Sequence, residues 1–411
     1  MKYGLIGERL GHSFSKEIHE SIANYEYKIQ EVAKDKLDDF MKAKDFFGIN
    51  VTIPYKEKVI PYLDYIDPSA KLIGAVNTIV NKNGKLHGYN TDFLGLRDLI
   101  LKSKVKIKDQ KVLILGNGGT SKTAQAVFKS LEAGIVKVVS LEPTGDEISY
   151  QDAVELHNDA QIILNATPVG MYPNNQDLII DIDCFNNLKG VFDVVYNPLK
   201  TKLLQKAKAK GIKAHGGLYM LVAQAVYASC IFRDVEIEQN VINEIYTKIR
   251  REKRNIVLIG MPSCGKSTIG KSLAKKLNKT FVDIDREIEK EIGTSIKTFI
   301  ELSGEEAFRK LETEVTYKFS KLNNQVIATG GGVIKRPINL ENLKQNGKIV
   351  FIDRPLDLLK PTTSRPLSND PDKLRQLYSE RYDIYMRNAD LVIKNDEEFE
   401  ECVHKLYHEV K

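Results

Sequence analysis

The chain has 411 residues, of which 42% are hydrophobic and 28% are charged, and its formal net charge is +6 at pH 7. The composition is that of a soluble globular protein, and the length is too great for one ordinary core, so we expect two or three domains. The positive charge is mild and no arginine-rich tract or aromatic-interleaved basic stripe accompanies it, which argues against nucleic-acid binding and suits anionic small substrates.

Cysteine usage and hydropathy indicate the compartment. The four cysteines are far apart and form no C-x-x-C pair, which fits a reducing compartment without structural disulfides or a zinc site. The longest apolar stretch, residues 218–232, is interrupted by Gln224 and too short to span a bilayer, so it predicts a buried helix. The first residues lack a signal-peptide core. We therefore expect a cytoplasmic protein with small-molecule partners, no nucleic acid and no membrane, and we leave a homodimer open.

The first 95 residues contain a series of polar motifs. Residues 3–6 read as a strand, and the loop that follows carries two hydroxyls, Ser13 and Ser15, which suit a polyhydroxylated ligand. In the run 50–56, alternation places Asn50, Thr52 and Lys56 on a common side, and Pro54 should end the strand. Further on, the pair Asn83-Gly84 predicts a hairpin turn.

Four of these motifs together resemble shikimate dehydrogenase, and the resemblance runs from about residue 1 to 245. They are Ser-Phe-Ser at 13–15, Asn-Val-Thr-Ile-Pro-Tyr-Lys at 50–56, Gly-Ala-Val-Asn-Thr at 74–78 and Gly-Tyr-Asn-Thr-Asp at 88–92. The resemblance implies that Lys56 and Asp92 are the catalytic pair. It also implies a set of residues that hold or face the substrate: Ser13, Ser15, Thr52, Asn77, Tyr196 and Gln224. Reduction of a ketone needs a proton donor at the developing alkoxide, and a lysine beside an aspartate suits that role.

A dinucleotide site is predicted from residue 111 onward. Residues 112–115 read as a buried strand, 116–121 as a glycine-rich turn and 124–131 as a helix, which is the order of a Rossmann-type site. The turn supplies the expected cofactor-binding residues: Gly116, Gly118, Gly119, Thr120 and Ser121. By the resemblance, Val194 and Gly217 pack around the nicotinamide, against the alternative that Val194 is only a core residue.

The end of the next strand should face the adenosine ribose. Shikimate dehydrogenases commonly carry Asn-Arg-Thr here, whose arginine receives the 2′-phosphate of NADP, whereas this chain has Ser-Leu-Glu-Pro-Thr at 140–144. The carboxylate of Glu142 would accept a hydrogen bond from a free 2′-hydroxyl and repel a 2′-phosphate. We hypothesise that NAD serves at least as well as NADP. In the alternative, Glu142 faces water and a nearby lysine serves the phosphate.

A basic segment joins the two halves of the chain, and a glycine-containing loop follows near the start of the second half. Residues 246–254 are rich in arginine and lysine and predict a solvated connector, with 250–254 as the linker. The following stretch, 255–268, is a strand-like run followed by Gly-Met-Pro-Ser-Cys-Gly-Lys-Ser-Thr, which is a P-loop. The predicted ATP-binding residues share this loop: Gly260, Ser263, Cys264, Gly265, Lys266, Ser267 and Thr268. Lys266 should reach the outer phosphates, and the hydroxyl of Ser267 should bind Mg²⁺.

The motifs after the P-loop resemble shikimate kinase over residues 254 to about 400. They are Phe-Val-Asp-Ile-Asp at 281–285, Phe-Arg-Lys-Leu-Glu at 308–312, Gly330 to Gly332, Arg-Pro-Leu at 365–367 and Glu-Arg-Tyr-Asp-Ile-Tyr at 380–385. We predict a strand over 281–285 with both carboxylates on one face. The resemblance implies shikimate-binding residues, namely Asp285, Arg309, Gly331 and Arg381, with Glu312 supporting Arg309. It also implies that Asp283 assists Mg²⁺, that Arg365 covers the phosphates, and that Lys266, Asp285 and Arg365 are catalytic.

The predicted fold is α/β throughout. Residues 1–249 should form a two-lobed dehydrogenase, with a substrate lobe of about 1–102 and 215–249 and a Rossmann-like lobe of about 103–214, and residues 255–411 a P-loop domain with a central parallel sheet. The two halves resemble enzymes of adjacent steps, since 3-dehydroshikimate is reduced to shikimate, which is then phosphorylated. We expect NADP or NAD, ATP and Mg²⁺ as cofactors. Two alternatives remain open: the reductase acts on quinate, or one half is a silent binding module.

Overall fold

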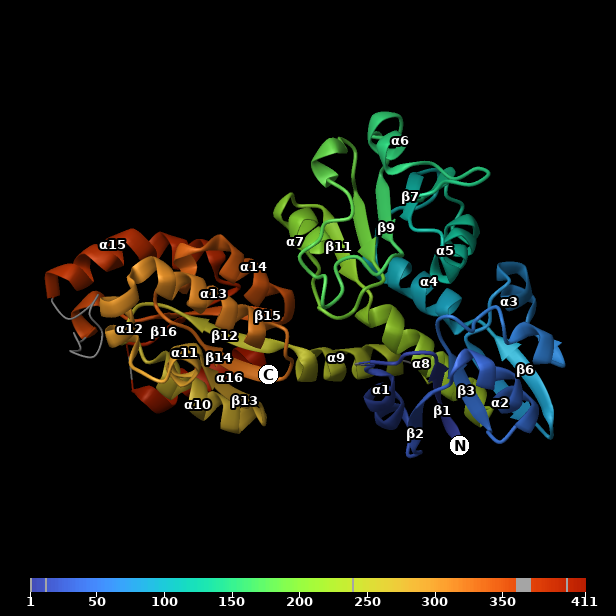
Figure 1. Ribbon diagram of the computed structural model, residues 1–411, viewed down its shortest axis with the longest axis horizontal. Helices are drawn as coiled ribbons and strands as arrows, with labels where there is room; N and C mark the ends of the chain where they lie inside the picture. The colour runs from blue at the N-terminus through green and yellow to red at the C-terminus, as the bar shows by residue number, and fades with distance from the viewer. Residues whose placement is uncertain (1, 12, 239, 360–370, 397) are drawn as a thin grey trace. The chain divides into compact units, whose positions relative to one another are not determined.

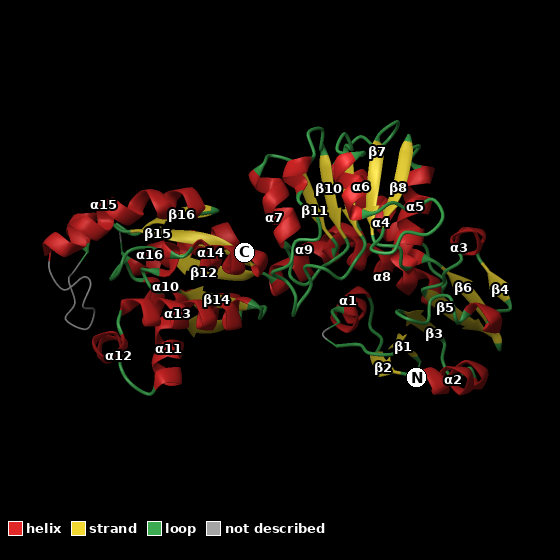
Figure 2. Ribbon diagram, turned by 45° about the horizontal axis from the view of Figure 1, so that its top comes forward, coloured by secondary structure: helices red, strands yellow, loops and turns green. Residues whose placement is uncertain are grey.

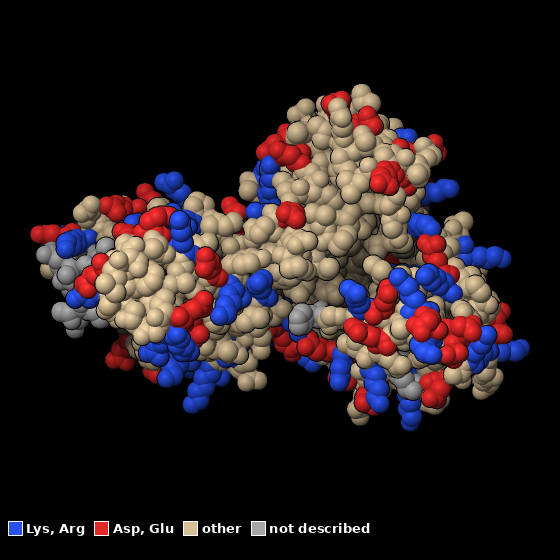
Figure 3. Space-filling model, in the orientation of Figure 1, with Lys and Arg blue, Asp and Glu red and all other residues tan. Residues whose placement is uncertain are grey.

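The structure is a computed structural model that describes the chain except residues 1, 12, 239, 360–370 and 397 (Figure 1). The chain divides into two compact units, Met1–Ile249 and Arg250–Lys411. The described residues form three sheets, two in the first unit and one in the second. No helix in the described part of the chain is long and apolar enough to cross a membrane. On the face drawn in Figure 3, acidic and basic side chains are interspersed.

The first sheet of unit 1 is mixed, in the order β2-β1-β3-β5-β6-β4. Its strands are β1 (Tyr3–Gly7), β2 (Tyr27–Glu31), β3 (Gly48–Val51), β4 (Tyr65–Ile66), β5 (Thr78–Lys82) and β6 (Lys85–Tyr89). Its helices are α1 (Ser15–Ile22), α2 (Leu37–Ala43) and α3 (Pro68–Ile73), with 3₁₀ turns at η1 (Lys34–Lys36) and η2 (Ile60–Tyr62). Asn83 and Gly84 both have positive φ, 53° and 83°, between antiparallel β5 and β6, which confirms the predicted hairpin.

Two long helices, α4 (Thr91–Ser103) and α8 (Leu218–Arg233), lie between the two sheets of unit 1 (Figure 1). Helix α8 is buried along most of its length, as its apolar sequence predicts. The two helices approach closely at Gly95, where a Cβ atom would lie 2.6 Å from the carbonyl oxygen of Met220. Only glycine permits this close contact between the two helices.

The second sheet of unit 1 is fully parallel, in the order β11-β10-β9-β7-β8. Its strands are β7 (Lys111–Leu115), β8 (Ile135–Val139), β9 (Ile162–Asn165), β10 (Gly190–Asp193) and β11 (Lys213–Gly216), and its helices are α5 (Gly119–Ser130), α6 (Tyr150–Glu155), α7 (Lys202–Ala209) and the 3₁₀ turn η3 (Ile182–Cys184). Alternate residues of β7 enter different cores, with Ile114 on one face and Leu113 on the other. The sheet is therefore covered on both faces, as a doubly wound fold requires.

Unit 2 has one parallel sheet in the order β13-β14-β12-β15-β16. Its strands are β12 (Asn255–Ile259), β13 (Thr280–Asp283), β14 (Gln325–Ala328), β15 (Gly347–Asp353) and β16 (Leu391–Lys394). Its helices are α10 (Lys266–Leu277), α11 (Ile284–Ile292), α12 (Ile296–Ser303), α13 (Glu305–Ser320), α14 (Pro337–Asn346), α15 (Pro371–Asn388) and α16 (Phe399–Val410), with 3₁₀ turns η4 (Val333–Lys335) and η5 (Leu356–Leu358). Helices α10 and α16 pack together on one face and α13 and α14 on the other (Figure 2).

The predicted strand over 281–285 is wrong at its end. Strand β13 stops at Asp283, whose carboxylate accepts a hydrogen bond from the backbone N–H of Arg286 at 3.4 Å and so caps α11. Asp285 therefore lies in the first turn of that helix. The physical reason is the four-residue spacing of Ile284 and Ile288, which are both fully buried and favour a helix over a strand.

The predicted solvated connector at 246–254 is also wrong in form, because most of it is helical. Helix α9 spans Val241–Lys253 and continues to within two residues of β12. Ile245 and Ile249 are buried in the core beside α8 and give α9 an apolar stripe at helical spacing. The arginines and lysines read as a linker occupy the helix's last turns, where cations suit the dipole.

Candidate active sites

The first candidate site is built around one ion pair. Lys56 follows β3, and Asp92 lies in the first turn of α4. The Nζ atom of Lys56 and the Oδ2 atom of Asp92 are 2.6 Å apart, and the two side chains are 16% and 13% exposed. The structure thus brings these predicted residues together, with a proton donor and an acceptor in direct contact and partly shielded from solvent.

Asp92 is positioned by the N-terminus of its helix. The side-chain oxygen of Asn90 caps α4 by accepting from the backbone N–H of Phe93 at 3.0 Å. Asn77, predicted to bind substrate, is buried, and its Oδ1 accepts from the backbone N–H of Thr91 at 2.7 Å while its Nδ2 donates to the Thr91 hydroxyl at 3.1 Å. Sequence reasoning assigned no role to Asn90 or Thr91. Asparagine directly before an apolar helical run is an N-cap signal that could have found the first of them.

Four residues predicted to contact the substrate lie on three segments: the loop with Ser13 and Ser15, the loop with Tyr196, and helix α8 with Gln224. The hydroxyls of Ser13 and Ser15 are 3.0 Å apart, and the phenol of Tyr196 hydrogen-bonds to Ser13. Burial raises the pKa of Tyr196, so it stays a neutral donor. Gln224 is buried on α8, and its Nε2 donates to the carbonyl of Leu221 at 2.8 Å. Its predicted contact with the substrate stays a prediction.

Thr52 lies directly beyond β3, where its backbone N–H donates to the carbonyl of Ile6 at 2.9 Å. Its methyl group packs against Gly7, since a Cβ on that glycine would lie 2.7 Å from it. The backbone of Thr52 is thus fixed at the carboxyl end of the strand. Its role with substrate stays a prediction.

The glycine-rich turn after β7 fits a dinucleotide. Gly116 has φ +98°, and Gly118 precedes the first residue of α5. Ideal Cβ atoms on Gly118 and Gly119 would have no atom within 4 Å, so the turn faces open space in front of a helix N-terminus. Thr120 and Ser121 follow in the first turn of α5. This arrangement suits a pyrophosphate, whose charge the backbone N–H groups would meet.

The carboxyl ends of the neighbouring strands complete this site. Gly217 lies so close to the carbonyl of Val194 that no side chain fits between them. Next to Val194, the carboxylate of Asp193 accepts from Asn165 Nδ2 at 3.1 Å, from the N–H of Val195 at 3.0 Å and from Thr201 Oγ1 at 2.7 Å. Burial raises the pKa of Asp193 to about 7. The sequence did not single out this buried carboxyl, which fixes the loop carrying Val194 and Tyr196.

An ion pair places the helix that follows the glycine-rich turn near Lys56, the predicted catalytic lysine. Lys122, in the first turn of α5, donates to the carboxylate of Glu57 at 2.7 Å. Since Glu57 directly follows Lys56, the helix that begins at the glycine turn and the proposed proton donor face the same region. Figure 3 shows the surface hollowed between the two lobes of unit 1.

The second candidate site is the P-loop of unit 2. Gly260, Ser263 and Gly265 have positive φ values of 145°, 64° and 94°, which curl the backbone between β12 and α10. Lys266 is buried, and its Nζ donates to the carbonyls of Gly260 at 2.9 Å and Met261 at 2.8 Å. Backbone N–H groups turned into such a loop form an anion-binding nest, so the residues fit a nucleoside triphosphate.

Other P-loop residues hold the loop to the rest of the unit. Cys264 is buried, and Asn395, at the end of β16, donates from Nδ2 to its carbonyl at 2.8 Å. Asn395 was not identified from the sequence, and no local motif marks it. Ser267 and Asp283 lie at the carboxyl ends of β12 and β13, which are separated by one strand. Their predicted roles as Mg²⁺ ligands stay predictions.

A glycine triplet gathers the predicted shikimate-binding residues beside the P-loop. A Cβ on Gly330 would lie 2.6 Å from Asp285 Oδ1 and 2.9 Å from Glu312 Oε1, and one on Gly332 would overlap the guanidinium of Arg309. A Cβ on Gly331 would lie 2.9 Å from Pro262 of the P-loop. Asp285, Glu312 and Arg309 therefore pack against one short turn, which itself touches the P-loop.

Charge pairing fixes the arginines of this site. Arg309 donates from Nη1 to Glu312 Oε2 at 2.8 Å and from Nη2 to Glu305 Oε1 at 3.0 Å. Desolvation opposes its charge, but the two carboxylates raise the pKa of Arg309 overall. Arg381 donates from Nη1 to the carbonyl of Gly331 at 2.9 Å. Its buried Nε and Nη2 atoms have no acceptor among the described residues, so this side chain can still receive a carboxylate.

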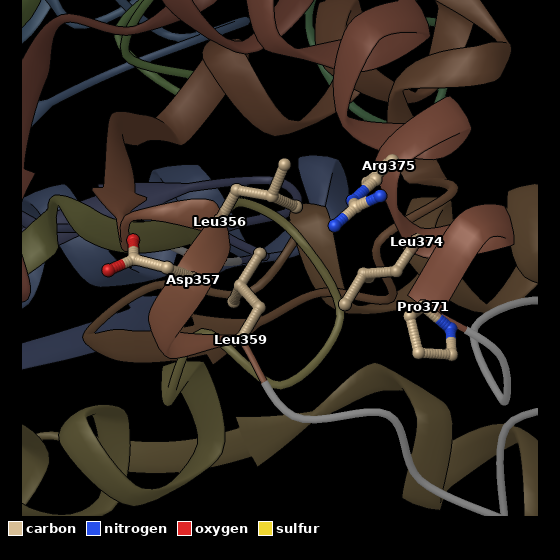
Figure 4. Close-up of a pocket in the computed structure, with 6 residues that line it drawn as sticks. All are labelled: Leu356, Asp357, Leu359, Pro371, Leu374 and Arg375. Atoms are coloured by element: carbon tan, nitrogen blue, oxygen red, sulfur yellow. The ribbon is translucent and has the colours of Figure 1, made fainter.

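The remaining predicted residue, Arg365, lies outside the described residues. A cavity of about 440 Å³ is lined by residues that flank that segment, including Leu359 on one side and Pro371 and Arg375 on the other (Figure 4). Among the described residues, none of those predicted to bind ATP or shikimate lines it.

Comparison with known proteins finds relatives for both halves of the chain. Residues 262–411 match the family model described as shikimate kinase, and residues 5–79 match the one described as shikimate dehydrogenase substrate binding domain. Shikimate dehydrogenase (NADP(+)) of Clostridium beijerinckii is 37% identical over 269 residues, which is 61% of this chain and 98% of that protein. The structure of a chorismate mutase/shikimate 5-dehydrogenase fusion protein from Clostridium acetobutylicum matches with 36% identity and a TM-score of 0.57, covering 60% of this chain and 96% of that one. The structure of quinate dehydrogenase from Corynebacterium glutamicum in complex with NAD matches with 26% identity and a TM-score of 0.54, covering 60% and 99%.

Proposed function

Because this chain belongs to the shikimate dehydrogenase family and carries a shikimate kinase domain behind it, we propose that it reduces 3-dehydroshikimate to shikimate and phosphorylates shikimate to shikimate 3-phosphate. The observation that carries the proposal is the presence of two complete constellations in one chain. One is the ion pair of Lys56 and Asp92 opposite a dinucleotide-type turn, and the other is the P-loop beside Asp285, Arg309 and Arg381.

In the dehydrogenase unit, Lys56 is the proposed proton donor. Bound NAD(P)H supplies a hydride to the carbonyl carbon. The Nζ atom of Lys56 gives a proton to the oxygen as negative charge develops there, and Asp92, 2.6 Å away, orients the ammonium. Six polar residues would orient the substrate: Ser13, Ser15, Thr52, Asn77, Tyr196 and Gln224.

In the kinase unit, the protein's contribution is positioning and charge neutralisation. Arg309 and Arg381 would grip the substrate carboxylate, because guanidinium groups bind carboxylates bidentately. Asp285 would orient the attacking hydroxyl and accept its proton. Lys266 and Arg365 would neutralise charge on the transferred phosphoryl group. Ser267 and Asp283 would hold Mg²⁺, which would supply further positive charge to the phosphates.

The direct test supplies the purified chain with 3-dehydroshikimate, NADH or NADPH, and Mg-ATP. We expect dinucleotide oxidation and the appearance of shikimate 3-phosphate, detected by mass spectrometry. Formation of shikimate without its phosphate would reject the kinase assignment. Phosphorylation of added shikimate without reduction of 3-dehydroshikimate would reject the dehydrogenase assignment. Either outcome would identify the inactive half as a catalytically silent unit.

Quinate is the second substrate to compare, since a quinate dehydrogenase is among the structural relatives. With each nicotinamide, oxidation of shikimate and of quinate should be measured side by side. We expect shikimate to give the larger kcat/KM, because it is also the kinase substrate. A larger value for quinate would replace the proposed substrate of the first unit.

The state of the cysteines bears on where the protein works. All four cysteines are free, which supports a reducing, cytoplasmic setting. We propose that the partners are small molecules and that the chain binds neither nucleic acid nor membrane. Cell fractionation tests the location, and sedimentation in solution would distinguish a monomer from a homodimer.

A further inference from the structure

The segment after β8 is acidic where the dinucleotide's adenosine ribose is expected. In a doubly wound dinucleotide site, the end of the second strand faces this ribose. Strand β8 ends at Val139, and residues 140–149 contain Glu142, Asp146 and Glu147 but no lysine or arginine. The family relative described above is named for NADP(+), whose 2′-phosphate carries about two negative charges at neutral pH, as other phosphate monoesters do.

Hydrogen bonds fold this segment back against the glycine turn. The N–H of Ile148 donates to the carbonyl of Val138, and the N–H of Ser140 to that of Ile148, both at 2.9 Å. The N–H of Gly116 donates to the carbonyl of Val139 at 2.7 Å. The acidic loop and the glycine turn are therefore adjacent at the carboxyl end of the sheet.

The carboxylate of Glu147 reaches the glycine turn directly. Its Oε2 atom accepts from Asn117 Nδ2 at 3.3 Å and from the backbone N–H of Thr144 at 3.1 Å. Glu142 is exposed on the same loop, where the Ser140 hydroxyl donates to its carbonyl at 3.3 Å. One carboxylate is thus held at the turn, and a second lies five residues before it on the same short loop.

The first turn of the glycine-turn helix carries one cation, Lys122, and that cation is already paired. Lys122 of α5 donates to Glu57 at 2.7 Å. A 2′-phosphate would have to break this pair or remain without a cation from the loop that faces it. A free 2′-hydroxyl has the opposite requirement, since it can donate a hydrogen bond to a carboxylate.

We propose that Glu142 and Glu147 form a ribose site that selects NAD over NADP by accepting from the 2′-hydroxyl and repelling the 2′-phosphate. The proposal rests on the proposed dehydrogenase function. It assigns NAD to this chain, whereas the relative described above is named for NADP(+). Each exposed carboxylate near a doubly charged phosphate weakens binding by about tenfold at low salt, and salt screens this effect.

Binding measured without catalysis provides the test. Isothermal titration should compare adenosine 5′-monophosphate with adenosine 2′,5′-bisphosphate, and NAD with NADP, at low and high salt. We expect the ligands without a 2′-phosphate to bind at least about tenfold more tightly at low salt, with a smaller difference at high salt. Equal or tighter binding of the 2′-phosphorylated ligands would overturn the proposal.

Charge-neutral variants assign the effect to these residues. Glu142→Gln and Glu147→Gln, alone and combined, should each reduce the preference for NAD over NADP. Glu155 is an exposed carboxylate on α6 of the same lobe, and Glu155→Gln should leave this preference unchanged. Circular dichroism verifies that each variant is folded. An unchanged preference in the double variant would reject the two glutamates as its source. If no nucleotide bound at all, the dehydrogenase assignment would fail along with this proposal, whereas tight NADP binding would remove the proposal alone.

Discussion

The two sites hold their charged groups in different ways. In unit 1, Lys56 and Asp92 form one short ion pair that remains partly accessible and is set by the N-terminus of α4. In unit 2, Arg309 is almost fully buried between Glu312 and Glu305, and Arg381 retains two buried donors without an acceptor in the described structure. The ion pair of the first site is thus closed within the protein, whereas Arg381 in the second site keeps two donors that a bound anion could accept from.

This difference has a physical consequence for what each site tolerates. An isolated ion pair that keeps some solvent access loses less folding free energy when one partner is removed, because water can reach the remaining charge. A buried network loses much more, because the remaining charge stays desolvated. We therefore expect mutations in the first site to affect catalysis alone, and mutations in the second to affect catalysis and stability together.

The sharpest separation of the two sites comes from one lysine in each. Lys56→Ala should abolish dinucleotide oxidation and leave phosphorylation of shikimate unchanged, and Lys266→Ala should do the reverse. Each loss should be at least about 10²-fold in kcat, since a charge-stabilising donor at the transition state is removed. Separate assays with 3-dehydroshikimate and with shikimate plus Mg-ATP check this. If either variant lowered both activities equally, the two sites would not be independent.

The buried network should show the next largest effect. Glu312→Gln leaves Arg309 with Glu305 as its charged partner and should destabilise unit 2 by up to about 3 kcal/mol. On heating, kinase activity should be lost at a lower temperature than in the parent protein, while dehydrogenase activity should be lost as before.

Glu306→Gln on the same helix is the matched control. Glu306 pairs with Arg336 and is 72% exposed, so its removal should change stability by less than about 0.5 kcal/mol. Equal effects from the two variants would contradict the contrast between buried and exposed pairs.

A pH dependence is expected in unit 1 from Asp193. Burial raises the pKa of this carboxyl to about 7 in the folded state, from an ordinary value of 3.8. Between these values the folded state binds more protons than the unfolded state, so stability should fall as pH rises from about 4 to 7, by at most about 1.4 kcal/mol per pH unit. Urea unfolding of the parent and of Asp193→Asn across this range measures the effect. The stability of Asp193→Asn should depend less on pH than that of the parent protein. An equal slope in the two proteins would reject Asp193 as the source of the pH dependence.

Sequence reasoning was most successful where one short segment determines both the local structure and the chemistry. The P-loop, the glycine turn after β7 and the hairpin at Asn83-Gly84 lie where they were predicted, since each depends on glycine or positive φ within a few residues. It was wrong at Asp285, where an alternating pattern predicted a strand but a helix begins. It was also wrong at α9, where the charged residues predicted a solvated connector although buried isoleucines recur at helical spacing. Asn395 and Asp193 could not be found, because their roles arise only when distant strands end at the same edge of a sheet.

The smallest expected effect concerns the ion pair that joins the lobes of unit 1. Lys122 and Glu57 are 45% and 52% exposed at a distance of 2.7 Å, so their coupling energy should be below about 1 kcal/mol. A double-mutant cycle with Lys122→Ala and Glu57→Ala, followed by urea unfolding at two salt concentrations, measures it. Because Glu57 directly follows Lys56, a larger and salt-insensitive coupling would mean that the pair is desolvated in solution. The first site would then resemble the buried network of the second, and the contrast between the two units would no longer hold.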